Sequence, residues 1–141
     1  AGGQFLDLNY EKKKIDFKKI INMQRKKTGK LFEFCCLAPA VIAKKSLKTQ
    51  KEMSMIGEEL GLLFQIADDL LDIKGYKKNT GKPVKKDKKK GKSTLIKLFG
   101  YEKTLEFALD RKKTIINKLK KYGKKSNKLI EISDFILNRS F

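Results

Sequence analysis

Apolar residues recur at helical spacing along most of this sequence. In residues 11–27, Phe17, Ile20 and Ile21 fall on one face of a helix, and lysines, Asn22 and other polar side chains occupy the opposite face. The pattern predicts an amphipathic helix over 11–27, with Ile15 on its polar side.

A second apolar stretch follows the segment Lys27-Thr28-Gly29, where we expect the chain to break or bend. Residues 30–45 are rich in Leu, Phe, Cys, Val and Ile and predict another helix. Pro39 lies inside that pattern. Because proline lacks a backbone N–H and clashes with the preceding turn, we expect it to kink the helix or end it near Ala38.

The strongest helical pattern covers residues 49–74 and is predicted to stop at Gly75. Glycines, a proline and stacked like charges predict a loop over 76–93. A short helix is expected over 94–99, ending at Gly100.

Two further helices are predicted over 101–122 and 126–139, separated by Gly123. No segment alternates between apolar and polar residues over five positions, as a half-buried strand would. The sequence therefore predicts an all-α fold in which 1–141 form a single region.

The formal net charge of +19 has three competing explanations. Lysines could neutralise nucleic-acid phosphates, or bind an anionic small substrate or membrane surface. The charge could also be compositional, because only Arg25, Arg111 and Arg139 among the 35 basic residues are arginine. Nucleic-acid readers use arginine more often, since its planar fork matches phosphates and guanine.

The two cysteines, Cys35 and Cys36, are adjacent and would point about 100° apart on a helix. With no histidine in the chain, a zinc site is not expected. We interpret both as small core residues in a reducing compartment. No signal peptide and no apolar run of membrane-spanning length is present, which predicts a cytoplasmic protein without stable membrane insertion.

Acidic side chains gather on one face of the 49–74 helix. At about 100° per residue, Asp68, Asp72 and Gln65 lie within about 60° of one another, and Asp69 lies at the edge of the same arc. Carboxylates at i and i+4 repel one another unless a cation bridges them. Hard oxygen ligands suit Mg²⁺, so the face predicts a magnesium site, with a solvated polar face as the alternative.

The segment after this helix supplies positive charge. Lys82 lies between Gly81 and Pro83, and Lys92 follows further along. Carboxylates, Mg²⁺ and flanking lysines are together what a diphosphate group requires, because the metal and the lysines share the neutralisation of its charge. The alternative for each lysine is a solvated loop.

Several segments, in this order along the chain, resemble the trans-prenyl diphosphate synthases, the family of farnesyl and geranylgeranyl diphosphate synthases. The resemblance rests on the segments Gly2-Gly3-Gln4 with Asp7-Leu8, Lys27-Thr28-Gly29, Phe64-Gln65-Ile66-Ala67-Asp68-Asp69-Leu70-Leu71-Asp72, Thr80-Gly81-Lys82-Pro83 and Gly91-Lys92-Ser93-Thr94. The aspartate segment is similar to the second aspartate-rich motif of that family.

The resemblance implies an all-α bundle, usually a homodimer, that condenses isopentenyl diphosphate with an allylic diphosphate with the help of Mg²⁺. Asp68 and Asp72 would bind Mg²⁺, with Asp69 supporting them. The implied roles of the remaining site residues are binding of the allylic diphosphate (Lys27, Lys82, Lys92), stabilisation of the allylic cation (Thr28, Gln65) and placement on a facing helix (Gln4, Asp7).

The family uses two aspartate-rich motifs, and nothing in residues 1–15 supplies the first. The chain thus resembles the C-terminal half of a synthase, which we expect to be inactive alone. One alternative is a non-catalytic partner subunit of a heteromeric synthase. Another is a basic helical nucleic-acid-binding protein, which would leave the three aspartates unexplained; we expect no nucleic-acid partner.

Overall fold

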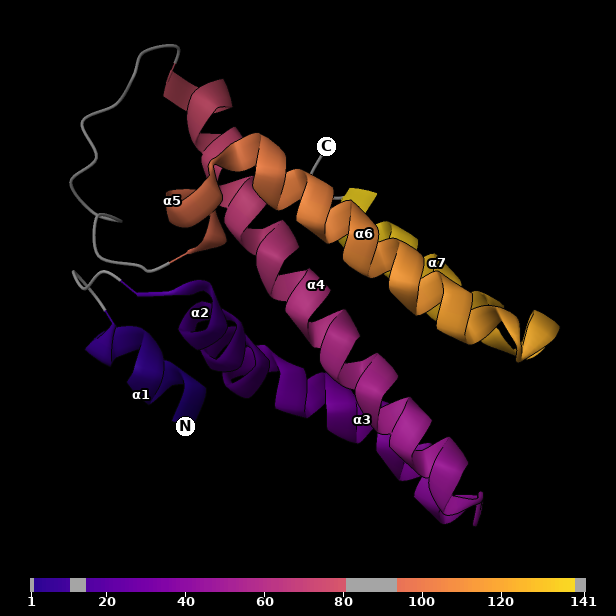
Figure 1. Ribbon diagram of the computed structural model, residues 1–141. Coiled ribbons are helices and arrows are strands. Elements are labelled where there is room, and N and C mark those ends of the chain that lie inside the picture. Colours follow the sequence, from indigo (N-terminus) through magenta and orange to yellow (C-terminus); the bar gives the residue numbers. More distant parts are fainter. Residues whose placement is uncertain (1, 11–14, 81–93, 139–141) are drawn as a thin grey trace.

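The computed structural model describes residues 2–10, 15–80 and 94–138, and for Asp7 and residues 74–80 only the helical backbone. These ranges hold helices and no strand, which confirms the all-α prediction (Figure 1). The elements are α1 (Gly2–Asn9), α2 (Phe17–Gln24), the π-helical turn η1 (Arg25–Gly29), α3 (Lys30–Ile42), α4 (Leu47–Thr80), α5 (Leu95–Phe99), α6 (Tyr101–Lys120), the 3₁₀ turn η2 (Gly123–Ser126) and α7 (Asn127–Asn138).

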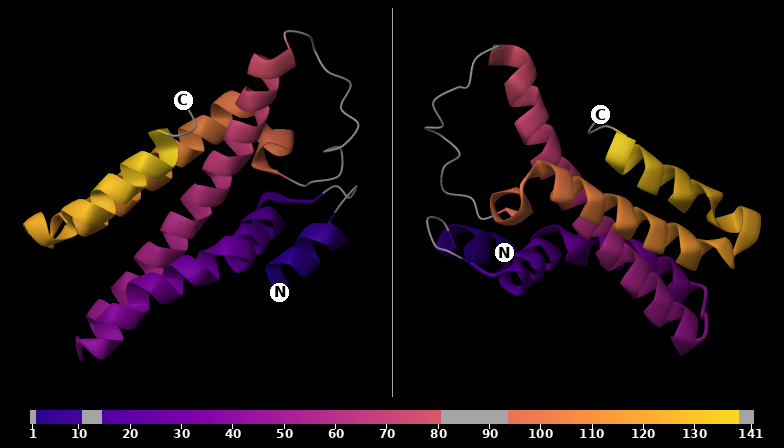
Figure 2. Two further views of the ribbon diagram at one scale, coloured as in Figure 1. Left: turned by 180° about the vertical axis from the view of Figure 1, so that it is seen from behind. Right: turned by 45° about the horizontal axis from the view of Figure 1, so that its top comes forward.

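The long helix α4 runs through the middle of the structure. The continuous segment α2–η1–α3 lies along one side of α4, and the pair α6–α7 packs on the other (Figures 1 and 2). One edge of α4, formed by Leu60, Leu63, Ile66 and Leu70, is fully buried. Full burial of each such side chain contributes about 1.5–3 kcal/mol to folding, so α4 organises the core.

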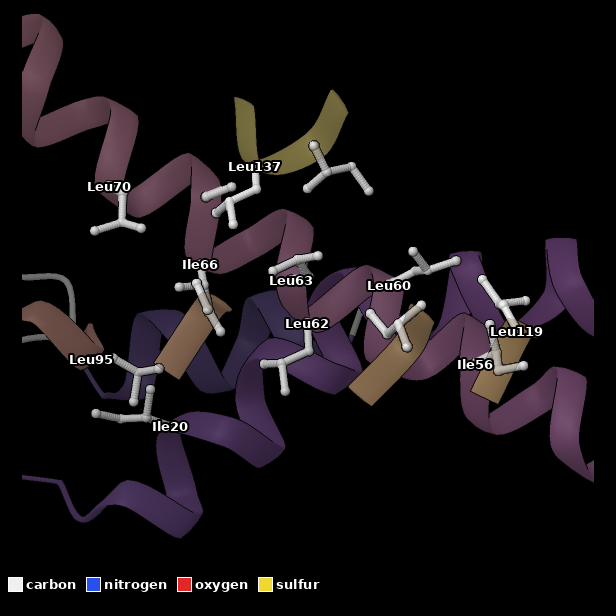
Figure 3. Packing of buried hydrophobic residues seen from close by; sticks show 14 of the residues in the cluster. Ile20, Ile56, Leu60, Leu62, Leu63, Ile66, Leu70, Leu95, Leu119 and Leu137 are labelled. Atoms are coloured by element: carbon white, nitrogen blue, oxygen red, sulfur yellow. The ribbon is translucent and has the colours of Figure 1, made fainter. Parts of the chain in front are cut away.

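Side chains from α2, α5, α6 and α7 meet this buried edge. Figure 3 shows Leu119 of α6 and Leu137 of α7 on one side of α4, and Ile20 of α2 with Leu95 of α5 on another. Because α2 and α5 share this cluster with α4, the core fixes where α2 lies relative to the aspartate-bearing part of α4.

Two glycines of α4 allow it to approach the neighbouring backbone closely. A Cβ atom on Gly61 would lie 2.6 Å from the Cα of Gly29, and one on Gly57 would lie 2.5 Å from the carbonyl oxygen of Phe32. The two segments run antiparallel through these contacts. The crossing therefore sets residue 28 opposite residue 65.

Of the break or bend expected at Lys27-Thr28-Gly29, the break is wrong. These residues continue the helix as a π-turn in which the Lys30 N–H donates to the carbonyl oxygen of Arg25, five residues earlier. A π-turn inserts an extra residue into a helix and re-aims the side chains around it. Gly29 here provides close packing rather than a helix stop.

The expected end of α4 at Gly75 is also wrong, and so is the end near Ala38, one of the two outcomes expected at Pro39. Helix α3 passes through Pro39 and ends at Ile42, and α4 passes through Gly75 and ends at Thr80. An interior glycine costs only about 1 kcal/mol relative to alanine, and tertiary contacts outweigh such local preferences. The contacts of α3 along α4 likewise offset the backbone hydrogen bond that Pro39 cannot donate.

The remaining boundaries agree more closely with the sequence patterns. Helix α2 begins at Phe17, where the Asp16 carboxylate accepts the Lys19 N–H at 2.8 Å; Ile15 precedes the helix and is buried, not polar-facing. Residues 11–14, and 81–93 of the expected loop, lie outside the described residues. Gly100 and Gly123 adopt positive φ angles of 81° and 57° at the expected ends.

The cysteine interpretation holds only in part. Cys36 is half-buried and burial raises the pKa of its thiol, but Cys35 is exposed and is not a core residue. No helix within the described ranges is long and apolar enough to cross a bilayer.

Candidate functional site

Two hydrogen bonds join the aspartate-bearing part of α4 to the segment α2–η1. Thr28 Oγ1 donates to Gln65 Oε1 at 3.1 Å, and Gln24 Nε2 donates to Asp69 Oδ2 at 3.0 Å. Residues 24 and 28, four positions apart on α2–η1, thus contact residues 69 and 65, which are four positions apart on α4. We call these four residues the amide clamp, because each bond uses a glutamine side-chain amide.

The local sequence explains why the clamp forms. Gly61 and Gly29 bring the two backbones together directly beside it. Helix α1 packs on the other side of the π-turn, where a Cβ atom on Gly3 would overlap the backbone nitrogen of Lys27. Small residues on both sides therefore hold the Lys27-Thr28-Gly29 segment between α1 and α4.

An ion-pair network also anchors the same π-turn. Arg25 Nη2 lies 2.7 Å from Glu59 Oε1, and Arg111 Nη1 lies 3.7 Å from Glu59 Oε2. The Arg111 guanidinium also stacks over the ring of Phe107, 5.2 Å from its centroid. Because Glu59 is largely buried, losing either arginine would leave a poorly compensated charge, so the network fixes η1 against α4 and α6.

The three aspartates of α4 differ in their surroundings. Asp68 and Asp69 are half-buried, Asp72 is exposed, and the Asp69 carboxylate is bonded to the buried Gln24 amide. Within 2–10, 15–80 and 94–138, no three acidic, histidine or cysteine side chains form a metal-binding cluster.

This donor set suits magnesium bound together with a substrate. Mg²⁺ typically takes one or two protein carboxylates and completes its shell with phosphate oxygens and water. Asp68 and Asp72, one helical turn apart, supply such a pair. The described residues fit a metal–diphosphate site and do not form an all-protein cage.

The other predicted site residues are placed to different extents. Lys27 is half-buried on the π-turn and Gln4 is exposed on α1. Asp7 lies on α1, while Lys82 and Lys92 fall outside the described residues, and their roles stay predictions. The structure thus brings Thr28 to Gln65, and the segment carrying Lys27 to the aspartates of α4.

Sequence reasoning missed Gln24. It follows Ile20 by four residues and Phe17 by seven, so it occupies the apolar face of its helix, and only 1% of its surface is exposed. A glutamine at an apolar position of a helix indicates a buried polar contact, and this signal is present in the sequence.

Comparisons with known proteins agree on one family. The polyprenyl synthetase family model matches residues 1–134. Farnesyl diphosphate synthase of Micrococcus luteus is 29% identical over 138 residues, which are 98% of this chain and 47% of that protein. The FPP/GFPP synthase structure from Zymomonas mobilis is 31% identical and superposes with a TM-score of 0.79, over 96% of this chain and 44% of that one.

A geranyltransferase of Helicobacter pylori, crystallised with magnesium and isoprenyl diphosphate, is also similar. It is 25% identical with a TM-score of 0.75, over 97% of this chain and 45% of that one. The chain therefore spans about half the length of the relatives that it matches.

Proposed function

Because the chain belongs to the polyprenyl synthetase family, we propose that it supplies one side of the magnesium–diphosphate site of an enzyme that condenses isopentenyl diphosphate with an allylic diphosphate. The observation that carries this proposal is the amide clamp. It joins Thr28 to Gln65 and Gln24 to Asp69, between the lysine-bearing π-turn and the aspartates of α4.

In this proposal Asp68 and Asp72 hold Mg²⁺ and Asp69 supports them. When bound, the metal neutralises the diphosphate and makes it a better leaving group. Lys27 binds the allylic diphosphate together with Lys82 and Lys92, since a point-charge ammonium on each neutralises phosphate oxygens. The magnesium and isoprenyl diphosphate in the similar Helicobacter pylori structure support this assignment.

Thr28 and Gln65 act on the reacting carbons. Their oxygen atoms lie 3.1 Å apart, and each carries lone-pair density that can face a developing allylic cation. Fixed dipoles of this kind stabilise charge without reorganising during the reaction. Gln4 and Asp7 belong to α1, which packs against the π-turn and is the facing helix of this proposal.

The activity belongs to a larger assembly than the 141 residues. The matched relatives are about twice as long, and helices α1 and α3 leave four large apolar side chains 66–70% exposed, namely Phe5 and Leu8 on α1 and Leu31 and Phe34 on α3. Exposed apolar surface of this kind marks an interaction face. We propose that the half of the fold carrying the first aspartate-rich motif covers it, in a homodimer, and that the isolated chain is inactive.

A second candidate uses the same exposed apolar side chains of α1 and α3. The chain could serve as a non-catalytic partner subunit of a heteromeric synthase, with a complete synthase seated on Phe5, Leu8, Leu31 and Phe34. The two candidates differ in whether Asp68 and Asp72 take part in turnover.

A chimeric enzyme tests the proposal. This chain replaces the aligned 47% of the Micrococcus luteus synthase, and the product is assayed with isopentenyl diphosphate and geranyl diphosphate. We expect condensation by the chimera, none by the 141-residue chain alone, and loss of turnover by orders of magnitude in the chimera carrying Asp68→Ala.

The outcomes separate the candidates. Condensation that survives Asp68→Ala would remove Asp68 from the reaction and favour the partner-subunit role. A chimera that is folded by circular dichroism, binds both substrates and still forms no product would contradict the proposed function.

A further inference from the structure

Gln24 is the last residue of α2 and its side chain is 1% exposed. Its Nε2 donates to Asp69 Oδ2 at 3.0 Å, and within the described residues its Oε1 has no hydrogen-bond partner. The opposite amide orientation would place Oε1 against a carboxylate oxygen, which is repulsive. The single bond to Asp69 therefore fixes how this amide is turned.

Stability alone does not account for a glutamine at this position. Burying an amide whose carbonyl lacks a partner costs free energy, and an apolar side chain would suit the same face of α2. A buried polar group kept under these conditions calls for a specific role. Among the described residues, the hydrogen-bond partner of this amide is Asp69, which lies next to Asp68 in the proposed metal site.

The bond links the segments that carry Lys27 and Asp68, two residues that a diphosphate site must hold at a fixed separation. Gln24 immediately precedes the π-turn that carries Lys27, and Asp69 immediately follows Asp68 on α4. The bond thus joins the start of the lysine-bearing turn to the middle of the aspartate segment. It also turns the Asp69 carboxylate toward α2.

We propose that Gln24 is a positioning residue that acts through Asp69, holding Lys27 and Asp68 at the separation that metal and diphosphate require. This inference rests on the proposed function and names a residue outside the recognised motifs. A partner that orients a metal-site carboxylate typically changes metal affinity on the order of tenfold or more when it is removed.

The test measures binding of Mn²⁺, a paramagnetic substitute for Mg²⁺, to the full chain in the presence of inorganic pyrophosphate, by electron paramagnetic resonance. Gln24→Leu removes the donor and keeps the volume. Gln24→Asn keeps an amide, but its shorter side chain cannot reach the Asp69 carboxylate. This second variant keeps the test valid if Gln24→Leu fails to fold. Tyr122→Phe is the matched control, because it removes a 2.6 Å bond to a different carboxylate of α4, that of Glu52.

We expect both Gln24 variants to bind Mn²⁺ about tenfold more weakly, and Tyr122→Phe to bind as the wild type does. The double variant Gln24→Leu/Asp69→Ala should lose no more than Asp69→Ala alone, because the two residues act as one unit. Unchanged Mn²⁺ affinity in folded Gln24 variants, or losses that simply add in the double variant, would overturn the inference.

Amide hydrogen exchange, measured by mass spectrometry, tests the role of Gln24 independently of the proposed function. If Gln24 positions the π-turn, amides of residues 25–29 exchange faster in Gln24→Leu and in Asp69→Ala, which removes the acceptor, but not in Tyr122→Phe. If the wild type binds no Mn²⁺ with pyrophosphate, this half of the site does not hold the metal by itself, and the exchange result still decides the role of Gln24. Unchanged exchange over 25–29 would overturn that role.

Discussion

Thr28 Oγ1 donates a 3.1 Å hydrogen bond to Gln65 Oε1 and thereby ties the π-turn to α4 one helical turn before Asp69. The bond is half-buried and joins residues 37 positions apart in the sequence. It makes the reactive face of the proposed site a tertiary feature that neither segment forms alone.

Thr28→Val should remove this bond while keeping the shape of the side chain. The Gln65 oxygen would lose its donor, so we expect the free energy of unfolding in urea to fall by about 1 kcal/mol. Thr28→Ser keeps the hydroxyl and serves as the control, with a smaller loss. Equal stability of the valine variant and the wild type would show that the bond does not form in solution.

Gly61→Ala should be more disruptive. Its new methyl group would lie 2.6 Å from the Cα of Gly29, where only backbone could move away. Overpacking of this kind costs about 1–3 kcal/mol or more, seen as a lower Tm in calorimetry. Gly2→Ala is the matched control, since a Cβ on Gly2 meets nothing within 4 Å. Similar Tm values for the two variants would contradict the close crossing of α4 and η1.

Lys27→Ala should weaken pyrophosphate binding measured in Mg²⁺ by about fivefold, because one partly shielded charge pair contributes about 1 kcal/mol. Lys26→Ala removes the same charge from the neighbouring residue, which is exposed. We expect the Lys26 variant to bind nearly as tightly as the wild type. Equal losses in the two variants would indicate that pyrophosphate senses only the net charge of the chain.

Acid should destabilise the contact between α3 and α4 through Glu33. This carboxylate accepts hydrogen bonds from Lys30 Nζ at 2.6 Å and Ser54 Oγ at 2.7 Å, and these bonds lower the Glu33 pKa below its ordinary 4.5. A lowered pKa means that the stabilisation is complete above pH 4.5 and is lost as the pH falls through the folded-state pKa.

The measurable consequence is the slope of Tm against pH below pH 4.5. Glu33→Gln should show a shallower fall than the wild type, because the uncharged amide cannot lose this stabilisation on acidification. Glu102→Gln, a change at an exposed glutamate of α6, should keep the wild-type slope. A wild-type slope in Glu33→Gln would contradict the role assigned to Glu33.

Local sequence signals account for much of this fold. The alternation of apolar and polar residues at helical spacing predicts α6 and α7, and glycines that need positive φ mark their ends at Gly100 and Gly123. The spacing of Asp68 and Asp72 follows from helix geometry alone. These features depend on neighbours within a few residues, so a sequence pattern can contain them.

The features that could not be predicted depend on packing between distant segments. Pro39 stays inside α3, which packs along α4, although proline locally favours a helix end. The π-turn forms where Gly29 packs against Gly61, and the bond of Gln24 to Asp69 joins residues 45 positions apart. No window of sequence around residue 24 or residue 29 contains those contacts.

The most direct test of the account is calorimetric titration of pyrophosphate into the 141-residue chain, with and without Mg²⁺. Two variants are compared with the wild type. Asp68→Asn/Asp72→Asn removes the proposed metal ligands, and Glu102→Gln/Glu106→Gln removes the same charge from an exposed i, i+4 pair on α6.

If the aspartates hold a metal that binds the diphosphate, Mg²⁺ should strengthen pyrophosphate binding to the wild type and to the glutamate variant, but not to the aspartate variant. Without Mg²⁺, the aspartate variant should bind at least as tightly as the wild type, since two repelling carboxylates are gone. Binding that ignores Mg²⁺ in all three proteins would contradict the account and show that the lysines alone attract the anion.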